Sequence, residues 1–293
     1  MRALSGNSFH WIIGSFSREG SNLNASTILQ VTHLKKEFGG VIAVNNVSFD
    51  VLRGEIFAVI GQNGAGKTTL FNLISGAHAP TSGEIHFEGK ALARARPHTR
   101  TKLGMARTFQ NLRLFNNMSV LENVMVGRHA RSRYGILEAA LRLPTATREE
   151  NAIRASAFKC VERVGLGAKA DELVGNLSFG GQRLVEIARA IATEPKILLL
   201  DEPGAGLTRH EVDELNQLIR DLRGGDGMTV ILVEHNMEFV MGIADRVMVL
   251  DYGQKIAEGT PPQVQRNPRV IAAYLGEEPF PAMRMEAQND VAS

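Results

Sequence analysis

The residues best suited to chemistry lie at positions 61 to 68, where the chain reads Gly-Gln-Asn-Gly-Ala-Gly-Lys-Thr. In this G-x-x-x-x-G-K-T spacing, glycines let the loop turn tightly and aim backbone N–H groups inward. The Lys67 ammonium can reach phosphate oxygens, and the Thr68 hydroxyl can bind Mg²⁺. An apolar helix expected to begin near Thr69 would add partial positive charge from its N-terminus. The pattern predicts a site for nucleotide phosphates and a magnesium ion.

Two adjacent carboxylates follow an apolar run at 197–200. A phosphate loop needs a carboxylate at the end of a neighbouring strand, and Asp201 can hold Mg²⁺ through the water shell of the ion. Glu202 comes next and can reach an attacking water as a general base. The loop and these two acids together predict hydrolysis of a nucleoside triphosphate.

The elements that must position these residues are strands that alternate with helices. Nearly continuous apolar runs suit strands buried on both faces of a parallel sheet, whereas alternating polarity suits half-buried strands. The sequence predicts strands at 28–31, 47–51, 56–60, 197–200 and 230–233, and a hairpin at 247–250 and 254–257. This alternation indicates an α/β core.

Helices are expected in the middle of the chain and near its end. Residues 111–190 contain few Gly or Pro breaks and are interpreted as a helical insertion into the core, with its last helix over 184–192. Thr208 and Glu211 have capping-box spacing, which predicts a helix running toward Gly224. A last helix is expected from Pro261 to about Gly276.

Composition and charge exclude several classes of protein. The chain has 293 residues, 44% hydrophobic and 22% charged, with a net charge of +2, so no strong global field draws it to nucleic acid or anionic lipid. The single cysteine, Cys160, allows no intrachain disulfide and fits a reducing compartment. No stretch approaches the roughly 20 apolar residues that span a bilayer, and no secretory signal is evident. We therefore expect a cytoplasmic chain.

The two ends of the chain differ in texture from the rest. Residues 1–27 are rich in Ser, Gly and Asn and are interpreted as a disordered extension, or as the product of a start site assigned too early. The polar tail at 277–293 is expected to be flexible. The region between them, 28–276, is long enough for one large domain or two small ones.

The segment at 177–183, Leu-Ser-Phe-Gly-Gly-Gln-Arg, resembles the signature motif of the ATP-binding cassette (ABC) family. Thr108-Phe109-Gln110 resembles the family's glutamine loop, and Val233-Glu234-His235 resembles its histidine switch. Phe38, before two glycines, resembles the aromatic residue that stacks on adenine. The resemblance covers roughly residues 28–276. It implies a P-loop NTPase (RecA-like) α/β core with an antiparallel β subdomain and an inserted helical subdomain at about 111–190.

The resemblance also implies roles for individual residues, with ATP and Mg²⁺ as the bound species. The nucleotide contacts would be Phe38, Gly61, Asn63, Gly64, Ala65, Gly66, Lys67, Thr68, Thr69, Ser178 and Gly180. The catalytic residues would be Lys67, Gln110, Glu202 and His235, and the magnesium ligands Thr68, Gln110 and Asp201.

A finer resemblance is to the ATP-binding subunits of branched-chain amino acid uptake systems. It rests on residues 68–76, 106–115 and 249–276, and on the aromatic Phe179 at the third signature position. It implies the motor subunit of an importer, peripheral on the inner face of the cell membrane. The implied partners are two membrane-spanning permease subunits, a second related or identical ATP-binding subunit in a head-to-tail dimer and, indirectly, an extracytoplasmic solute-binding protein.

Two residues depart from the family pattern. Gly181 stands where the signature usually has Gln, and Thr208 stands where the loop after Glu202 usually has Asn or Asp. Lost side-chain contacts at these positions could weaken communication across a dimer, but the phosphate and metal ligands are untouched.

Three other functions compete with import. The motor of an exporter, such as one that extracts lipopolysaccharide, would look similar. A nucleic-acid-linked ABC ATPase is suggested by the basic stretch at 94–142, although such proteins usually carry two cassettes or a long coiled coil, so no nucleic acid partner is expected. The plainer interpretation of that stretch is a solvated face or one that docks membrane subunits. A P-loop kinase or GTPase would leave the signature and histidine segments unexplained.

Overall fold

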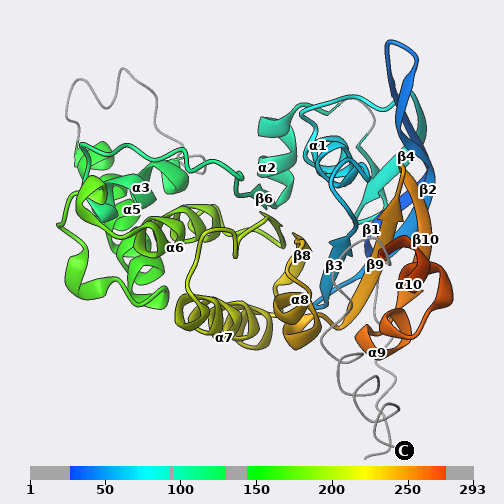
Figure 1. The fold of residues 1–293 in the computed structure, drawn as a ribbon. Helices are drawn as coiled ribbons and strands as arrows, with labels where there is room; N and C mark the ends of the chain where they lie inside the picture. Colours follow the sequence, from blue (N-terminus) through cyan, green and yellow to red (C-terminus); the bar gives the residue numbers. More distant parts are fainter. Residues whose placement is uncertain (1–26, 93–94, 130–143, 275–293) are drawn as a thin grey trace, which may run out of the picture.

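The computed structural model describes residues 27–92, 95–129 and 144–274, which form two β-sheets and a set of helices beside them (Figure 1). The smaller sheet is antiparallel, with strand order β2-β1-β4-β5. Its strands are β1 (Thr27–Phe38), β2 (Val41–Leu52), β4 (Ser82–Phe87) and β5 (Lys90–Ala91).

The larger sheet has strand order β10-β9-β3-β8-β7-β6 and is parallel except for β10, which pairs antiparallel with β9. All five residues of β3, of β7 and of β8 are buried, as expected for central parallel strands. The strands are β3 (Ile56–Ile60), β6 (Met105–Arg107), β7 (Ile197–Asp201), β8 (Thr229–Val233), β9 (Arg246–Asp251) and β10 (Gln254–Gly259).

Side chains of the central strands alternate between two hydrophobic cores. In β3, Ile56, Ala58 and Ile60 face a core shared with most of the helices, and Phe57 and Val59 face a core shared with the smaller sheet and the helix at 67–75. The same alternation holds in β7 and β8. Because successive side chains of a strand point to opposite faces, apolar runs are needed where both faces are covered.

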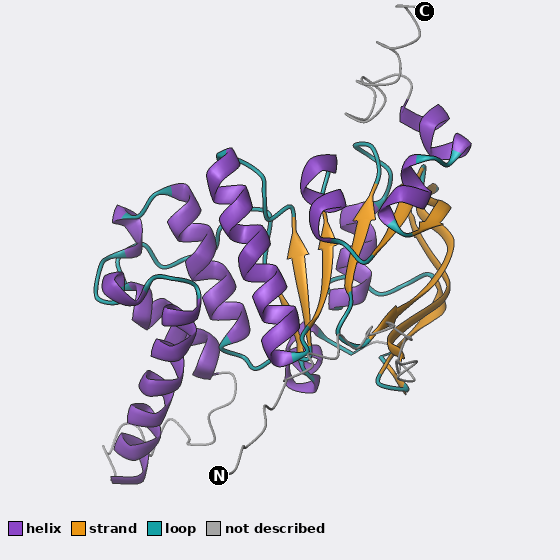
Figure 2. Cartoon of the chain, turned by 90° about the horizontal axis from the view of Figure 1, so that it is seen from below, coloured by secondary structure: helices purple, strands orange, loops and turns teal. Residues whose placement is uncertain are grey.

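The helices fall into two groups. Helices α3, α5 and α6 pack on one another and form a helical region at one end of the molecule (Figures 1 and 2). The others pack along the larger sheet and its ends, with α1 against β7 and β8, and α7 against β8 and α8. The bounds are α1 (Lys67–Ser75), α2 (Pro97–Leu103), α3 (Val120–His129), α5 (Pro144–Arg163), α6 (Phe179–Ile191), α7 (Arg209–Asp226), α8 (Met237–Ile243), α9 (Pro261–Gln265) and α10 (Pro268–Tyr274), with 3-10 turns η1 (Gly167–Lys169) and η2 (Val174–Asn176).

Parallel pairing sets the position of the reactive segments. Strands β3, β7 and β8 run in one direction, so their carboxyl ends meet at one edge of the sheet. The phosphate loop follows β3, Asp201 and Glu202 lie at the end of β7, and His235 follows β8. Ligand sites of open α/β sheets form at this edge.

Most elements expected from the sequence are present, and several boundaries differ. The predicted strands and the hairpin are confirmed. Helix α1 begins at Lys67 rather than near Thr69, and α6 begins at Phe179 rather than at 184. The helix expected from 261 to 276 was wrong as a single element, because the described part is two helices, α9 and α10, separated before Pro268. A proline disfavours helical conformation in the residue before it.

Several features were not expected from the sequence. Strands β4, β5 and β6 and helix α2 were not predicted. The interpretation of 94–142 as a solvated basic face is wrong at Arg100, which is buried and donates to the carbonyls of Leu73 (2.7 Å) and Ile74 (2.5 Å) at the end of α1. Burial lowers the pKa of Arg100 to about 10.

The proposed extension at 1–27 lies outside the described residues except for Thr27, which already belongs to β1. The tail at 277–293 also lies outside them. Within the described ranges, every helix is too short or too polar to cross a bilayer.

Candidate active site

The phosphate loop at 61–68 connects β3 to α1 and depends on glycine for its path. Gly64 and Gly66 have φ of 82° and 100°, in the left-handed region that favours glycine. A Cβ on Gly66 would lie 2.3 Å from the carbonyl oxygen of Ala43. A Cβ on Gly61 would lie 2.3 Å from the carbonyl oxygen of Leu250. The loop is therefore pressed against its neighbours and leads its N–H groups into the start of a helix, the arrangement that binds phosphate.

Lys67 is the first residue of α1 and crosses the loop. Its buried Nζ donates to the carbonyl oxygens of Gly61 (2.5 Å) and Gln62 (2.9 Å). The ammonium group therefore lies inside the curve of the loop. Of the other expected contacts, Asn63, Gly64 and Thr68 are exposed, Gly66 and Thr69 are half-buried, and Ala65 is buried.

Asp201 forms a buried ion pair that the sequence did not suggest. Its Oδ2 lies 2.8 Å from Nη2 of Arg107, a residue of β6. Nη1 of Arg107 also donates to Asn72 Oδ1 (2.7 Å) and Ser75 Oγ (2.8 Å) on α1. Arg107 thus ties Asp201, the carboxylate expected to bind magnesium, to the helix that follows the phosphate loop. One signal for this contact was present in the sequence: Arg107 directly follows two apolar residues, in a stretch that was interpreted as a basic face.

Glu202 and Gln110 meet although 92 positions separate them. Gln110 Nε2 donates to Glu202 Oε2 at 2.8 Å. Glu202 has a φ of 46°, which is uncommon for a residue with a side chain and marks local strain. The structure therefore brings the expected base and the glutamine-loop residue into direct contact.

A buried ion pair on α6 holds the backbone on either side of Gln110. Arg183 and Glu186 lie 2.9 Å apart. Glu186 Oε1 accepts from the N–H of Phe109 (3.1 Å), and Arg183 donates to the carbonyl oxygens of Phe109 (3.0 Å) and Gln110 (3.3 Å). Burial raises the pKa of the Glu186 carboxyl, against the opposing effects of the Phe109 N–H and the Arg183 charge. The helix of the signature motif is therefore fastened to the glutamine loop.

His235 lies at the end of β8, with an exposed side chain. Its neighbour Glu234 is fully buried and accepts hydrogen bonds from the N–H groups of Gly204, His235 and Asn236. Sequence analysis assigned no role to Glu234. A charged residue directly after a fully apolar strand was the signal that could have found it.

Ser178 and Gly180 belong to the helical region, and the structure does not bring them to the phosphate loop of their own chain. Ser178 caps α6 by accepting from the N–H of Gly181 at 3.1 Å. Gly180 packs against Glu211 of α7, where a Cβ would lie 2.3 Å from the carboxylate. Helix α6 packs on α3 and α5, whereas α1 packs on the larger sheet (Figure 1).

Phe38 ends β1 and is partly exposed. Its ring lies 5.4 Å from that of His78 in an edge-on arrangement, and Lys36 Nζ lies 4.7 Å from its centroid.

The donors proposed for magnesium suit that ion. Mg²⁺ prefers oxygen ligands and keeps several waters. Thr68 offers an exposed hydroxyl, and Arg107 engages Oδ2 of Asp201, which leaves Oδ1 for a hydrated cation. Gln110 uses its Nε2 on Glu202, which leaves its amide oxygen. Among the residues that the structure describes, no group of three or more His, Cys, Asp or Glu side chains could hold a metal ion. A magnesium ion would therefore rely on the hydroxyl, amide and carboxylate oxygens named above and on water.

Comparisons with known proteins agree with this geometry. The family described as "ABC transporter" matches residues 44–205, and that described as "Branched-chain amino acid ATP-binding cassette transporter" matches residues 254–279. The high-affinity branched-chain amino acid transport ATP-binding protein LivG of Escherichia coli (strain K12) is 43% identical over 250 residues, 85% of this chain and 98% of LivG.

Solved structures are similar over the same part of the chain. An ATP-binding cassette of an ABC transporter in its ADP conformation is 33% identical, with a TM-score of 0.75 over 86% of this chain and 100% of that one. A dimeric bacterial ABC transporter cassette is 26% identical, with a TM-score of 0.68 over 80% of this chain and 99% of that one. From its sequence, its sheet and its phosphate loop alike, this chain belongs to the ABC transporter family, as an ATP-binding subunit that hydrolyses ATP.

Proposed function

We propose that this chain powers the import of branched-chain amino acids or related small polar solutes. The observation that carries the substrate class is the likeness to LivG along nearly its whole length. The subfamily's C-terminal match adds support, because it covers β10, α9 and α10. Helix α10 touches the phosphate loop, where Gln62 Nε2 donates to the carbonyl oxygen of Ala273 at 2.7 Å.

In the proposed mechanism, Lys67 and the loop N–H groups hold the β- and γ-phosphates of ATP. A magnesium ion, when bound by Thr68, Gln110 and hydrated Asp201, would offset negative charge on the phosphates. Glu202 accepts a proton from the attacking water as general base. The hydrogen bond from Gln110 orients the Glu202 carboxylate. His235 donates to the γ-phosphate.

We assign the remaining contacts to a second ATP-binding subunit, related or identical, placed head to tail. Because the phosphate loop and Ser178 lie in separate parts of one chain, a partner's Ser178 and the following helix N-terminus can complete the γ-phosphate site. The dimeric relative supports this arrangement. ATP would then favour the closed pair and hydrolysis would release it.

We place the docking site of two membrane-spanning permease subunits beside Gln110. A groove of about 380 Å³ is lined by Phe109, Phe115 and Val126, all exposed. Exposed apolar side chains in a groove mark protein–protein contact sites. Phe109 precedes Gln110 directly, so a permease seated here could respond to the nucleotide. The chain would then act as a peripheral subunit on the inner face of the membrane, with the solute-binding protein acting only through the permeases.

Two variants test the assignment in the full-length chain purified with its co-purifying subunits. Glu202→Gln keeps the shape of the side chain and removes the base, so we expect retained ATP binding, turnover reduced by about 10³-fold or more and an ATP-trapped dimer. Lys67→Ala should instead lose ATP binding in a nucleotide titration. Turnover near wild type in Glu202→Gln would refute the role of Glu202.

The identity of the co-purifying proteins tests the transport role. Two hydrophobic subunits together with stimulation of ATPase activity by a branched-chain amino acid and its binding protein would support import. An exporter would show hydrophobic partners but no such stimulation. A salt-dependent affinity for DNA or RNA would favour a nucleic-acid-linked ATPase instead.

A further inference from the structure

The carboxylate of Glu234 joins two loops that carry the proposed catalytic groups. Its Oε1 accepts from the N–H of Gly204 at 2.7 Å, and its Oε2 accepts from the N–H of His235 at 3.1 Å and of Asn236 at 3.4 Å. Gly204 lies two residues after Glu202, in the loop that leads to α7. The fully buried side chain therefore connects the loop after β7 to the turn after β8.

A second contact fixes the same loop at its start. The N–H of Glu202 donates to the carbonyl oxygen of Val233 at 2.9 Å. The loop is thus held at residues 202 and 204 by the consecutive residues 233 and 234. Glu202, at the first of these two points, has an uncommon φ of 46°. A strained backbone persists only where surrounding contacts fix it, and these two contacts do so.

We propose that Glu234 is a positioning residue of the ATPase reaction, which clamps the loop of Glu202 to the backbone of His235 so that the two keep a fixed separation. The proposal rests on the roles proposed above for Glu202 and His235. The clamp acts through backbone atoms, so its effect reaches both side chains without Glu234 touching the nucleotide.

A carboxylate suits this position better than its amide. Three N–H donors converge on two oxygens, and an ionised carboxylate is acceptor-only. A glutamine would present an NH₂ group to at least one of these donors and leave it unsatisfied. Burial raises the pKa of the Glu234 carboxyl, whereas the N–H donors and the His235 ring, whose Nδ1 lies 3.8 Å away, act in the opposite direction.

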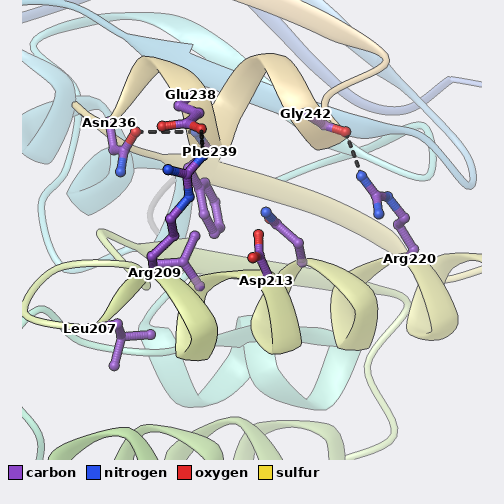
Figure 3. A pocket seen from close by; sticks show the side chains of 10 residues that line it. Leu207, Arg209, Asp213, Arg220, Asn236, Glu238, Phe239 and Gly242 are labelled. Atoms are coloured by element: carbon purple, nitrogen blue, oxygen red, sulfur yellow. Dashed lines mark hydrogen bonds and ion pairs between the residues drawn. The ribbon is translucent and has the colours of Figure 1, made fainter.

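An exposed ion pair between the two helices that follow these loops provides a matched control. Arg209, the first residue of α7, reaches Glu238 in the first turn of α8 at 2.8 Å, across a pocket between the helices (Figure 3). The side chains of Arg209 and Glu238 are 83% and 70% exposed, whereas that of Glu234 is fully buried. Exposed pairs contribute little, so removing this one should leave the loops in place.

The first test compares steady-state kinetics of three variants of the full-length chain purified with its co-purifying subunits. We expect kcat to fall by about tenfold in Glu234→Gln, which keeps one acceptor oxygen, and further in Glu234→Ala. The KM for ATP should change by less than about threefold, because the phosphate loop is untouched. Glu238→Gln should match wild type. A wild-type kcat in Glu234→Ala, with the protein folded by circular dichroism, would overturn the proposal.

A double-mutant cycle with His235→Ala separates positioning from a general structural role. If Glu234 acts through His235, Glu234→Gln should lower the residual kcat of His235→Ala by much less than it lowers that of wild type. Equal fold-reductions in both backgrounds would indicate structure alone and overturn the proposal. Measuring Glu202→Gln in parallel distinguishes failure of the proposed catalytic site from failure of the proposed clamp. If that variant turns over normally, the proposed site fails; if it is inactive and Glu234 variants are normal, only the clamp fails.

Discussion

Two parts of the site lie at one edge of the larger sheet but are built in different ways. One is the phosphate loop after β3. The other, the carboxylate cluster, consists of Asp201, Glu202 and Glu234 at the ends of β7 and β8. In the loop, backbone N–H groups and glycine conformations make the site, and Gly61 and Gly66 lie against neighbouring carbonyls. In the cluster, side chains hold one another across the chain: Arg107 on Asp201, Gln110 on Glu202, and Glu234 on the N–H of Gly204.

This difference predicts two kinds of response to substitution. A backbone-made site fails sterically, since no rotamer change can relieve a clash between a Cβ and a carbonyl. A site made of side-chain contacts loses one interaction at a time, each with its own energy. We therefore expect the largest effects from substitutions in the phosphate loop and smaller effects from substitutions that remove one side-chain contact.

Gly66→Ala should abolish measurable binding of Mg-ATP, with a loss of about 100-fold or more, because its Cβ would lie 2.3 Å from Ala43 O at a φ of 100°. Gly64→Ala is the control. Gly64 also has a positive φ, but no atom lies within 4 Å of its Cβ position. It should carry only backbone strain of about 1–2 kcal/mol. Isothermal titration with ATP measures both, and equal losses would contradict the steric explanation.

Arg107→Ala should lower the free energy of unfolding by about 3 kcal/mol, because it leaves Asp201 buried without its partner. Arg107→Lys keeps the charge but cannot reach Asp201, Asn72 and Ser75 together, so it should recover only part of the loss. Urea unfolding curves give both values. Stability equal to wild type in Arg107→Ala would show that the pair is not needed to hold Asp201.

The same contrast explains how much of the protein could be predicted from its sequence. The phosphate loop and strands β3, β7 and β8 were predictable because glycine spacing and apolar runs are local signals. Arg107 and Glu234 were missed because their partners lie 94 and 30 positions away. Arg100 looked like part of a basic face, and only the fold places it on the carbonyl groups at the end of α1.

The same limit applies to contacts among the expected site residues: the residues were predictable, but their partners in space were not. Direct contact between Gln110 and Glu202 was not predicted, although both residues were named. No local pattern specifies which side chains meet after strands β6 and β7 pair. The separation of Ser178 from the phosphate loop likewise follows from the packing of α6 on α3 and α5, not from any spacing in the sequence.

Stability should respond to pH in opposite directions at a buried and a half-buried glutamate. Burial raises the pKa of Glu186, so its favourable contribution is present below the unfolded-state pKa and is lost as pH rises through the folded-state value. Hydrogen bonds from Thr208 lower the pKa of Glu211, so its contribution is present above the unfolded-state pKa and is lost as pH falls through the folded-state value.

Relative to wild type, Glu186→Gln should therefore gain stability as pH rises above 4.5, the ordinary pKa of a glutamate. Glu211→Gln should lose stability relative to wild type as pH rises toward 4.5 from below. Urea unfolding of the three proteins at a series of pH values measures these differences, in which all other groups cancel. Parallel pH profiles for the two variants would contradict the assigned causes.

Thr208→Ala should have the smallest effect, a loss of about 1 kcal/mol and a fall in Tm of about 2 °C. Thr208 caps α7: its Oγ1 accepts from the N–H of Glu211 (3.4 Å), and its own N–H donates to Glu211 Oε2 (2.9 Å). This confirms the capping box expected from the sequence. Water can replace a lost cap at an exposed helix end, so the site itself should keep its kcat within about twofold.

Position 208 departs from the family pattern, which usually has Asn or Asp there. Thr208→Asn restores the usual residue and tests whether this departure matters. Threonine and asparagine both cap helices well, so the two proteins should melt within about 1 °C of each other. Thermal unfolding checks the stability and a phosphate-release assay checks kcat. A large rise in kcat in Thr208→Asn at unchanged Tm would mean that position 208 contacts a second subunit rather than serving α7 alone.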